Sequence, residues 1–406
     1  MRRTRAILPT TLLILLGLAV LNLRGGNEPA PERPALPGAR VTIEAIRYPS
    51  LQAALDALPQ EGGLVRLPAG EFKIQEPLRL TKGDVSLVGA GASTHIQNAN
   101  TEGKSALVIE PADYAENKRA KLWRVEVANL RITGNPESGH GLEANAVNEI
   151  YLHGLTISEN GGDGARLDQC IEDPRINSCL FTYNKKSGVQ LIGCHDIVVN
   201  GNQFEENLDA LRCEDGYNLC MTGNNLDDHL RDGVVIANTY GSVVSGNMIE
   251  ECQGRGIVLE RDCYGIAISA NAIPHNVGAG IDLVDAHGCS ITGNALPIMK
   301  NNAIRIGPDS GRIVVAGNAF SDSTIGPDQQ MRLPKDQQAA GLVLEGTSDV
   351  AVAGNLFSGV KPKAVAVEGE PSRRILFSGN VVTDAESDHA DLPDSVTTGN
   401  LESEPR

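Results

Sequence analysis

The sequence predicts an all-β fold in which one chain winds into a coil of short parallel strands, a β-helix. Two observations carry this prediction. From Ala128 onward an apolar alternation ending in Gly-Asn, or a close variant, recurs every 22 to 24 residues through the clearest copies. A period of that length leaves no room for a helix between parallel strands, and the segments lack the 3.6-residue spacing of a helix. In composition, Gly is plentiful at 44 residues and aromatic residues make up only 3%, so the core must consist of aliphatic and small side chains.

Each repeat contains two recognisable elements. One ends in an Asn that is followed two places later by an apolar residue, at Asn202, Asn224, Asn247, Asn271, Asn294, Asn318, Asn355 and Asn380. The other has the form Gly-apolar-x-apolar and begins at Gly141, Gly164, Gly188, Gly233, Gly256, Gly280 and Gly341. Strands of successive coils are expected about 4.8 Å apart, with the recurrent Asn forming an inward amide ladder that satisfies the turns. Leucine-rich repeats share the period, but their Leu-x-x-Leu-x-Leu pattern is missing.

The start of the repeat region predicts a cap. Residues 49–58 can form a short helix with Ser50 as its N-cap and one apolar face made of Leu51, Ala54, Leu55 and Leu58. Such a helix would cover the apolar end of the first coil, as terminal repeats require. We therefore expect one β-helix domain over residues 41–400, with an irregular insertion over 321–338.

The N-terminus has the plan of an export signal. Residues 1–24 contain a basic head and an apolar run, and residues 25–40 form a Pro-rich linker. No convincing cleavage site follows, so a cleaved signal peptide and an uncleaved anchor both stay open. We expect an exported protein that is secreted, periplasmic or held at the membrane by this segment.

The eight cysteines are predicted to fill space rather than to form disulfides. Cys179 and Cys289 each lie five residues before a repeat Asn, and Cys194 and Cys263 each lie eight before one. Such fixed places in the repeat suit small apolar fillers inside a coil, where free thiols behave as hydrophobic groups. No Cys-x-x-Cys pair is present, which argues against a zinc or thioredoxin-like site.

The charge balance limits the possible partners. The formal net charge of −16 makes nucleic acid an unfavourable partner. A polyanion would be repelled unless local basic groups or a bound cation reversed the field.

Three early segments resemble a known superfamily. Ser-Leu-Gln-Ala-Ala-Leu-Asp56, Gly-Gly-Leu-Val-Arg-Leu-Pro-Ala-Gly-Glu-Phe72 and Ser-Leu-Val-Gly-Ala-Gly91 look like the opening of pectate-lyase-like right-handed parallel β-helix proteins. The Gly-Asn repeats are similar to the later coils of that superfamily, so the resemblance covers roughly residues 48 to 400. It implies a right-handed, single-stranded parallel β-helix solenoid. It does not choose a reaction, because the superfamily includes lyases, hydrolases, C5-epimerases, tailspikes, adhesins and periplasmic accessory proteins.

The x position of the Gly-apolar-x-apolar element points outward, as does the residue after the second apolar one. Read coil by coil, the x positions form a column: Glu143, Arg166, Gln190, Arg212, Val235, Val258, Asp282, Arg305, Val343 and Ala366. Polar residues concentrate in the first coils of this column and of its neighbours. One patch therefore gathers His140, Glu143, Asp163, Arg166, Asp168, Gln190, Asp209, Arg212, Glu214 and Asp232.

The favoured interpretation of this patch is a groove for a uronate-containing polysaccharide, used by a lyase or C5-epimerase. Arg166 or Arg212 would offset the carboxylate of the sugar, with Asp168 and Glu214 completing the catalytic group. Asp163, Asp209 and Asp232 would supply the hard oxygen ligands that Ca²⁺ prefers. Substrate would be bound by His140, Glu143, Gln190, Tyr217 and Tyr240.

Two other interpretations stay open. As a glycoside hydrolase, the chain would use Asp209 with Asp232, or Asp168 with Glu214, at spacings that suit retaining or inverting chemistry. As a non-catalytic carbohydrate-binding protein, adhesin or periplasmic accessory protein, it would pair these charges with one another across coils. Tyr217, Tyr240 and Tyr264 recur at nearly one-coil spacing, and we expect them to stack on one another more readily than on sugar rings.

Overall fold

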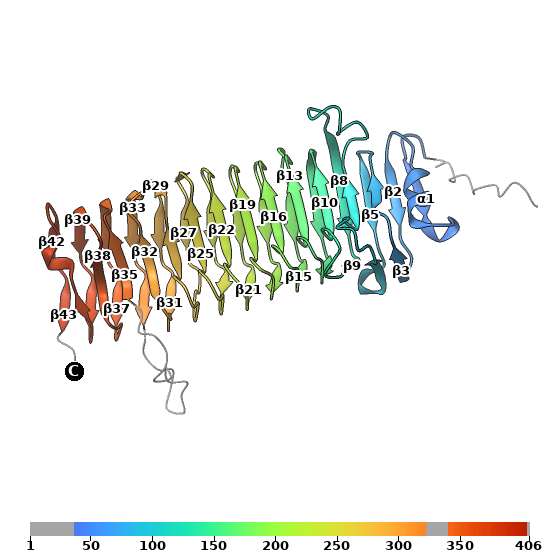
Figure 1. Cartoon of the computed structure of the whole chain (residues 1–406). Coiled ribbons are helices and arrows are strands. Elements are labelled where there is room, and N and C mark those ends of the chain that lie inside the picture. Colours follow the sequence, from blue (N-terminus) through green and yellow to red (C-terminus); the bar gives the residue numbers. More distant parts are fainter. Residues whose placement is uncertain (1–35, 322–339, 404–406) are drawn as a thin grey trace, which may run out of the picture.

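The chain is a long stack of coils in the computed structural model, which describes residues 36–321 and 340–403. Figure 1 shows the strands following one another along a single axis, with α1 at one end and β43 near the other. The strands belong to three parallel faces, here named sheets A, B and C. This confirms the predicted parallel β-helix.

Sheet C, the face predicted to carry the groove, has 13 strands that follow the chain order without exception. They are β4 (Leu78–Leu80), β7 (Leu107–Ile109), β10 (Leu142–Asn145), β13 (Ala165–Asp168), β16 (Val189–Ile192), β19 (Leu211–Glu214), β22 (Val234–Ala237), β25 (Ile257–Glu260), β28 (Ile281–Leu283), β32 (Asn302–Ile306), β35 (Ala340–Glu345), β38 (Lys363–Glu368) and β41 (Glu386–Ser387).

Sheet A has 17 strands. They are β1 (Val41–Glu44), β2 (Gly63–Arg66), β5 (Val85–Val88), β8 (Leu122–Ala128), β11 (Val147–His153), β14 (Arg175–Asn177), β17 (Val198–Asn200), β20 (Cys220–Thr222), β23 (Val243–Ser245), β26 (Cys263–Tyr264), β27 (Ala267–Ser269), β29 (Ala286–His287), β30 (Ser290–Thr292), β33 (Gly311–Ala316), β36 (Ser348–Ala353), β39 (Arg373–Ser378) and β42 (Val396–Thr398).

Sheet B consists of an eight-stranded and a five-stranded part. The first contains β3 (Gly70–Ile74), β6 (Thr94–Asn98), β9 (Arg131–Thr133), β12 (Thr156–Ser158), β15 (Leu180–Thr182), β18 (Gln203–Glu205), β21 (Asn225–Asp227) and β24 (Met248–Ile249). The second contains β31 (Ala295–Pro297), β34 (Ala319–Ser321), β37 (Leu356–Ser358), β40 (Val381–Thr383) and β43 (Leu401–Ser403).

The repeat Asn residues form the predicted inward ladder. Asn247 is representative: its side-chain Nδ2 donates to Oδ1 of Asn271 at 3.0 Å, and its Oδ1 accepts from the backbone N–H of Asn224 at 3.0 Å. The backbone N–H of Asn247 donates in turn to Oδ1 of Asn271 at 3.0 Å. Because each buried turn would otherwise leave a backbone N–H unpaired, the ladder explains why the sequence repeats Asn at this place.

A short helix covers one end of the stack, as predicted. Helix α1 runs over Leu51–Asp56, and the Oγ of Ser50 accepts a hydrogen bond from the backbone N–H of Ala53 at 3.1 Å. Leu51, Ala54 and Leu55 are buried. Three short 3-10 helices accompany the strands: η1 (Ala45–Arg47), η2 (Gly91–Ser93) and η3 (His389–Asp391).

All eight cysteines are free thiols, and seven of them are buried, which agrees with their predicted filling role. Burial raises the pKa of Cys213 to about 12, so this thiol stays protonated and unreactive. Cys220 differs from the other seven because it lies on the outer face of sheet A and is exposed.

The predicted export signal over residues 1–24, most of the linker over 25–40 and nearly all of the predicted insertion over 321–338 lie outside the described residues. Export therefore stays a prediction from sequence. Within residues 36–321 and 340–403, no helix has the length and apolar character needed to cross a membrane.

Candidate functional site

The outer face of sheet C carries two adjoining hollows over its early strands. The larger has a volume of about 420 Å³ and lies over β13, β16 and β19, while the smaller, of about 310 Å³, lies over β10 and β13. Arg166 lines both hollows and so forms the wall between them. The strand register brings Glu143, Arg166, Gln190 and Arg212 into one column, as predicted from the repeat.

Cationic side chains dominate the larger hollow. Arg166, Lys186, Arg212 and Arg231 line it, against the carboxylates of Asp163 and Glu214. Asp168 and Asp209 pair with these arginines from just outside the lining, so Lys186 is the cationic group of the hollow that makes no ion pair with a described residue. Such a hollow can attract an anion that the rest of the surface repels.

Arg166 and Arg212 are each held by a carboxylate on their own strand. Nη2 of Arg166 lies 2.8 Å from Oδ2 of Asp168, and Nη2 of Arg212 lies 3.0 Å from Oε1 of Glu214. A weaker ion pair joins Nη1 of Arg166 to Oε1 of Glu143 at 3.8 Å. Asp168 and Glu214, predicted as catalytic, thus orient the guanidinium groups. Glu143 is itself fixed by the Oγ of Ser105, which donates to it at 2.8 Å.

The coil of β16 separates these two ion-paired groups. Its outward strand residues, Gln190 and Ile192, line the larger hollow and carry no charge, while Lys186 lines the hollow from the turn before the strand. Among the described residues, the side chain of Gln190 has no hydrogen-bond partner, and neither has the ammonium group of exposed Lys186. Because Arg166 and Arg212 lie two coils apart, about 10 Å separates them along the groove.

His140 and Asp163 form a pair at the edge of the larger hollow. Nδ1 of His140 lies 3.0 Å from Oδ2 of Asp163 and also 3.0 Å from its backbone nitrogen. The carboxylate is almost fully buried, whereas the imidazole is 20% exposed. With Nδ1 occupied, Nε2 is the ring nitrogen left for a ligand. The sequence predicted separate roles for these two residues and missed their pairing, since they belong to neighbouring coils.

The smaller hollow contains a phenol that the outward-column pattern could not reveal. Tyr114 and Lys118 lie in the segment between β7 and β8, and both line the hollow with Glu143 and Asp168. Nζ of Lys118 lies 3.8 Å from the centre of the Tyr114 ring. Burial first, and then the negative charge of Asp168, raises the pKa of Tyr114. The phenol is therefore a proton donor rather than a base at neutral pH. The unusual length of the segment between β7 and β8 is the feature of the sequence that could have indicated a contribution to the groove.

Asp209 and Asp232, predicted as metal ligands, are instead bound to arginines and backbone of the next coil. Oδ1 of Asp209 accepts from Nε of Arg231 at 2.8 Å and from the backbone N–H of Asp232 at 3.1 Å. Asp232 holds Arg255 in the same way, through Oδ2 to Nη2 at 2.9 Å. Burial would raise the pKa of Asp209, but Arg231, the Asp232 N–H and Arg212 together outweigh it, and the pKa is lowered.

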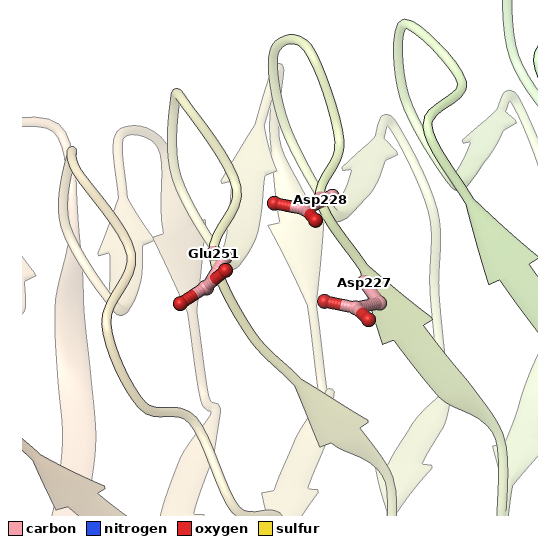
Figure 2. Close-up of side chains that lie close together, drawn as sticks. All are labelled: Asp227, Asp228 and Glu251. Atoms are coloured by element: carbon pink, nitrogen blue, oxygen red, sulfur yellow. The ribbon is translucent and has the colours of Figure 1, made fainter.

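Asp163 belongs to the same column, because its Oδ1 accepts from the backbone N–H of Ser187 at 2.8 Å. The structure thus does not bring Asp163, Asp209 and Asp232 together as ligands for one ion. Within the described part of the chain, the acidic, His or Cys side chains that do gather as a set of three are Asp227, Asp228 and Glu251. Figure 2 shows these three on neighbouring coils, and Asp227 is the last residue of β21 in sheet B, with Asp228 directly after it. None of the three lines either hollow.

The predicted tyrosine row exists, but its rings face one another. Tyr217 and Tyr240 stack with ring centres 5.6 Å apart and planes 17° apart, and the edge of His195 packs on Tyr217 at 4.6 Å. Tyr217 thus lies between His195 and Tyr240, and its ring faces are occupied by these neighbours. The alternative of mutual stacking is therefore confirmed, and neither Tyr217 nor Tyr240 lines the hollows.

Comparison with known proteins agrees with this architecture. A family model described as a right-handed beta helix region matches residues 93–229 and 140–296, which together span just over half of the chain. A search among curated protein sequences found no match.

Among solved structures, the A-module of the mannuronan C-5 epimerase AlgE4 from Azotobacter vinelandii superposes with a TM-score of 0.63 at 16% identity, over 81% of this chain and 98% of that one. The periplasmic alginate epimerase AlgG gives 0.51 at 13% identity, over 83% and 82%. Tailspike protein 3 of bacteriophage CBA120 gives 0.55 at 11% identity, over 81% and 60%. At such identities the likeness establishes the fold alone. Together with the match to the family model, it shows that the chain belongs to the right-handed β-helix family.

Proposed function

We propose that the chain binds a uronate-containing polysaccharide in the groove of sheet C and acts on it as a lyase or C5-epimerase. The observation that carries the proposal is the larger hollow, where Arg166, Lys186, Arg212 and Arg231 gather on an otherwise acidic protein. Two of the superposed structures are, by their names, epimerases of mannuronan or alginate, which supports this substrate class. That the polymer is met outside the cytoplasm rests on residues 1–24 alone.

Both reactions begin by removing the proton on C5, next to the carboxylate of the sugar. A guanidinium that binds this carboxylate lowers the cost of the negative charge that develops on it. Arg166 suits this task because it lines both hollows and because Asp168 fixes one side of it at 2.8 Å. Arg212, two coils on and fixed by Glu214, is placed to bind a second carboxylate of the same polymer.

His140 is the group best placed to take the C5 proton. In the structure its Nδ1 accepts a hydrogen bond from the backbone N–H of Asp163. For Nε2 to have a free lone pair at the hollow, Nδ1 must instead hold the ring proton and donate it to Oδ2 of Asp163, which lies 3.0 Å away. Tyr114, on the other side of Arg166, is protonated and can donate. Donation to C5 from the opposite face would invert that centre. Donation to the departing O4, as the C4–O bond breaks, would complete elimination.

The other interpretations receive unequal support. Non-catalytic binding is favoured by the pairing of Arg166 with Asp168 and of Arg212 with Glu214, since paired ladders are also what a passive surface shows. Hydrolysis by Asp209 and Asp232 is not favoured. Both carboxylates are almost fully buried and bound to arginines, and a lowered pKa makes Asp209 a poor acid. No step of the proposed reaction needs Ca²⁺. The Ca²⁺ site predicted from the sequence is tested separately with a chelator.

The test is incubation of the full chain with mannuronan, polygalacturonate and a neutral glucan, with and without chelator. Unsaturated ends, reducing ends and epimer content would be followed together. We expect an unsaturated or epimerised product from a polyuronate only. Arg166→Gln and His140→Gln should each abolish it, whereas Arg305→Gln, six coils along the same column, should not.

Retention of polyuronate that depends on Arg166, without any product, would establish the binding protein and reject the enzyme. Absence of both product and retention on every polyuronate would reject the groove itself. Release of new reducing ends without unsaturation would instead favour hydrolysis.

A further inference from the structure

Two outward columns of sheet A carry no charged side chain over nine successive coils. Together they define a surface, here called the uncharged face. The first column is Val198, Cys220, Val243, Ala267, Ser290, Val314, Ala351, Leu376 and Val396. The second is Asn200, Thr222, Ser245, Ser269, Thr292, Ala316, Ala353, Ser378 and Thr398.

The absence of charge is local to these coils. The same two columns carry Glu126, His153 and Arg175 in the coils that come before. Charged residues make up 21% of the chain, so eighteen uncharged outward positions in succession are not what the composition alone would give. Large apolar side chains lie open on the face, with exposed fractions of 38% for Val243 and 43% for Val314.

The uncharged face also has the outline of an interface. Charged side chains stand along one edge of its last coils, where Arg374 pairs with Asp349 through Nε and Oδ1 at 2.7 Å and Arg312 is exposed. Along the other edge the turns after the strands are mostly glycine, as at Gly246 and Gly317, where an added Cβ would meet open space. An apolar centre with a polar rim is the arrangement found in protein interfaces.

We propose that the uncharged face is a docking surface for a second copy of this chain. Two copies that each carry a net charge of −16 repel one another over most of their surfaces. Only a face without charges lets them meet without burying unpaired carboxylates. Neighbouring coils are about 4.8 Å apart and the two columns about 7 Å, so the face measures about 40 Å by 12 Å. Pairing would bury about 1,000 Å² in total, the lower bound for a specific interface.

The geometry of such a dimer fixes one contact of Ser290 for each orientation of the stacks. A two-fold axis relates the copies of a simple homodimer, and the interface is the same patch on both. Ser290 occupies the middle of the first column. When the two stacks run antiparallel, with the axis across the middle of the columns, Ser290 meets its own counterpart. When they run parallel, the first column of each copy lies against the second column of the other, and Ser290 meets Thr292.

Sedimentation velocity of the full chain at about 1 to 100 µM tests the proposal, since an interface of this size is expected to bind in the micromolar range. We expect a concentration-dependent dimer. Val243→Lys and Val314→Lys should each weaken it by more than about tenfold, because each places two unpaired ammonium groups in the interface. Val277→Lys is the matched control. Val277 is 36% exposed and lies off sheet A, so this variant should dimerise like the wild type.

A second measurement covers variants that fail to fold. In a Cys220→Ser background, mild oxidation should form an intermolecular disulfide in Ser290→Cys if the stacks run antiparallel, or in an equal mixture of Ser290→Cys and Thr292→Cys if they run parallel. Val277→Cys should form none. The proposal is overturned if the chain is monomeric throughout, or if a dimer persists in both lysine variants, as it would if residues 1–35 caused the association. It is also overturned if monomeric wild type adsorbs to insoluble neutral glucan and Val243→Lys does not, which would assign the face to a polysaccharide.

Discussion

Replacing Asp209 by Asn should destabilise the protein, since the carboxylate closes the turn between two coils. Its Oδ1 accepts from Nε of Arg231 and the backbone N–H of Asp232, while Oδ2 faces Arg231 and lies 3.4 Å from Nη1 of Arg212. An amide keeps one acceptor and turns the other into a donor that faces two guanidinium groups. Removing one partner of a buried ion pair costs about 3 to 5 kcal/mol.

The structure places the expected loss below that range. The side chain of Asp209 is completely buried, but that of Arg231 is 47% exposed and can turn to water once released. We therefore expect the free energy of unfolding to fall by about 2 to 3 kcal/mol. The lowered pKa of Asp209 gives the sign of the pH dependence. Its stabilisation is complete above the ordinary pKa of an aspartate and is lost as the pH falls through the lowered folded value.

Asp227→Asn is the matched control, because the pKa of Asp227 is shifted in the opposite direction. Asp227 is the last residue of β21 in sheet B. Burial, followed by the negative charges of Glu250, Asp228 and Glu251, raises the pKa of Asp227. A raised folded pKa means that the charged form costs stability at neutral pH, and that this cost disappears as the pH falls through the raised value. The neutral amide should therefore leave the protein as stable as the wild type, or more stable, at pH 7.

Chemical denaturation at pH 7, followed by far-ultraviolet circular dichroism, checks both variants. Because a solenoid can unfold in segments, amide hydrogen exchange in β19 and β22 should accompany it. The reasoning fails if Asp209→Asn unfolds like the wild type yet loses activity on polyuronate, since Asp209 would then be a reactive group. It fails equally if Asp227→Asn loses as much stability as Asp209→Asn.

Four further predictions concern the ladder, the core and the groove. Asn247→Ala should lower the free energy of unfolding by about 3 kcal/mol by leaving buried backbone groups unpaired, as measured by denaturation. Burial lowers the pKa of His229 to about 4 from an ordinary 6.5. On acidification, His229 is therefore protonated at a higher pH in the unfolded protein than in the folded one. Wild-type melting temperature should fall between pH 6.5 and 4, and His229→Leu should reduce that fall. Gln190→Glu should raise the melting temperature and weaken retention on polyuronate. A thiol reagent should label only Cys220 in the folded protein and all eight thiols after denaturation, as counted by mass spectrometry.

Much of the fold followed from the sequence because one coil repeats one pattern. The period placed Glu143, Arg166, Gln190 and Arg212 in register, since side chains alternate between the inside and the outside of a strand. What lay between the strands was not predictable in the same way. Tyr114 reaches the groove from an irregular segment whose path no periodicity sets.

Turn geometry also explains where the acidic side chains lie. Asp209 and Asp232 look outward in the pattern, yet each lies just before a strand, where its carboxylate can reach the backbone of the next coil. The partner arginines, Arg231 and Arg255, stand in those turns and outside any strand column. The uncharged face is not predictable from the sequence for a different reason. Val, Ala and Ser serve inside and outside a coil alike, so their composition does not reveal which face is open.

The position of the hollow follows from a gap in a charge ladder. In the later coils of sheet C, Asp282 joins two arginines, with Oδ2 3.2 Å from Nη1 of Arg255 and Oδ1 2.9 Å from Nη1 of Arg305. The carboxylate of Asp282 therefore offsets the positive charge of both arginines. Gln190 occupies the equivalent place between Arg166 and Arg212 but supplies no charge, so the two guanidinium groups share no carboxylate there. Arg166 and Arg212 thus face the uncharged Gln190 from either side, and an anionic ligand can lie between them at that coil.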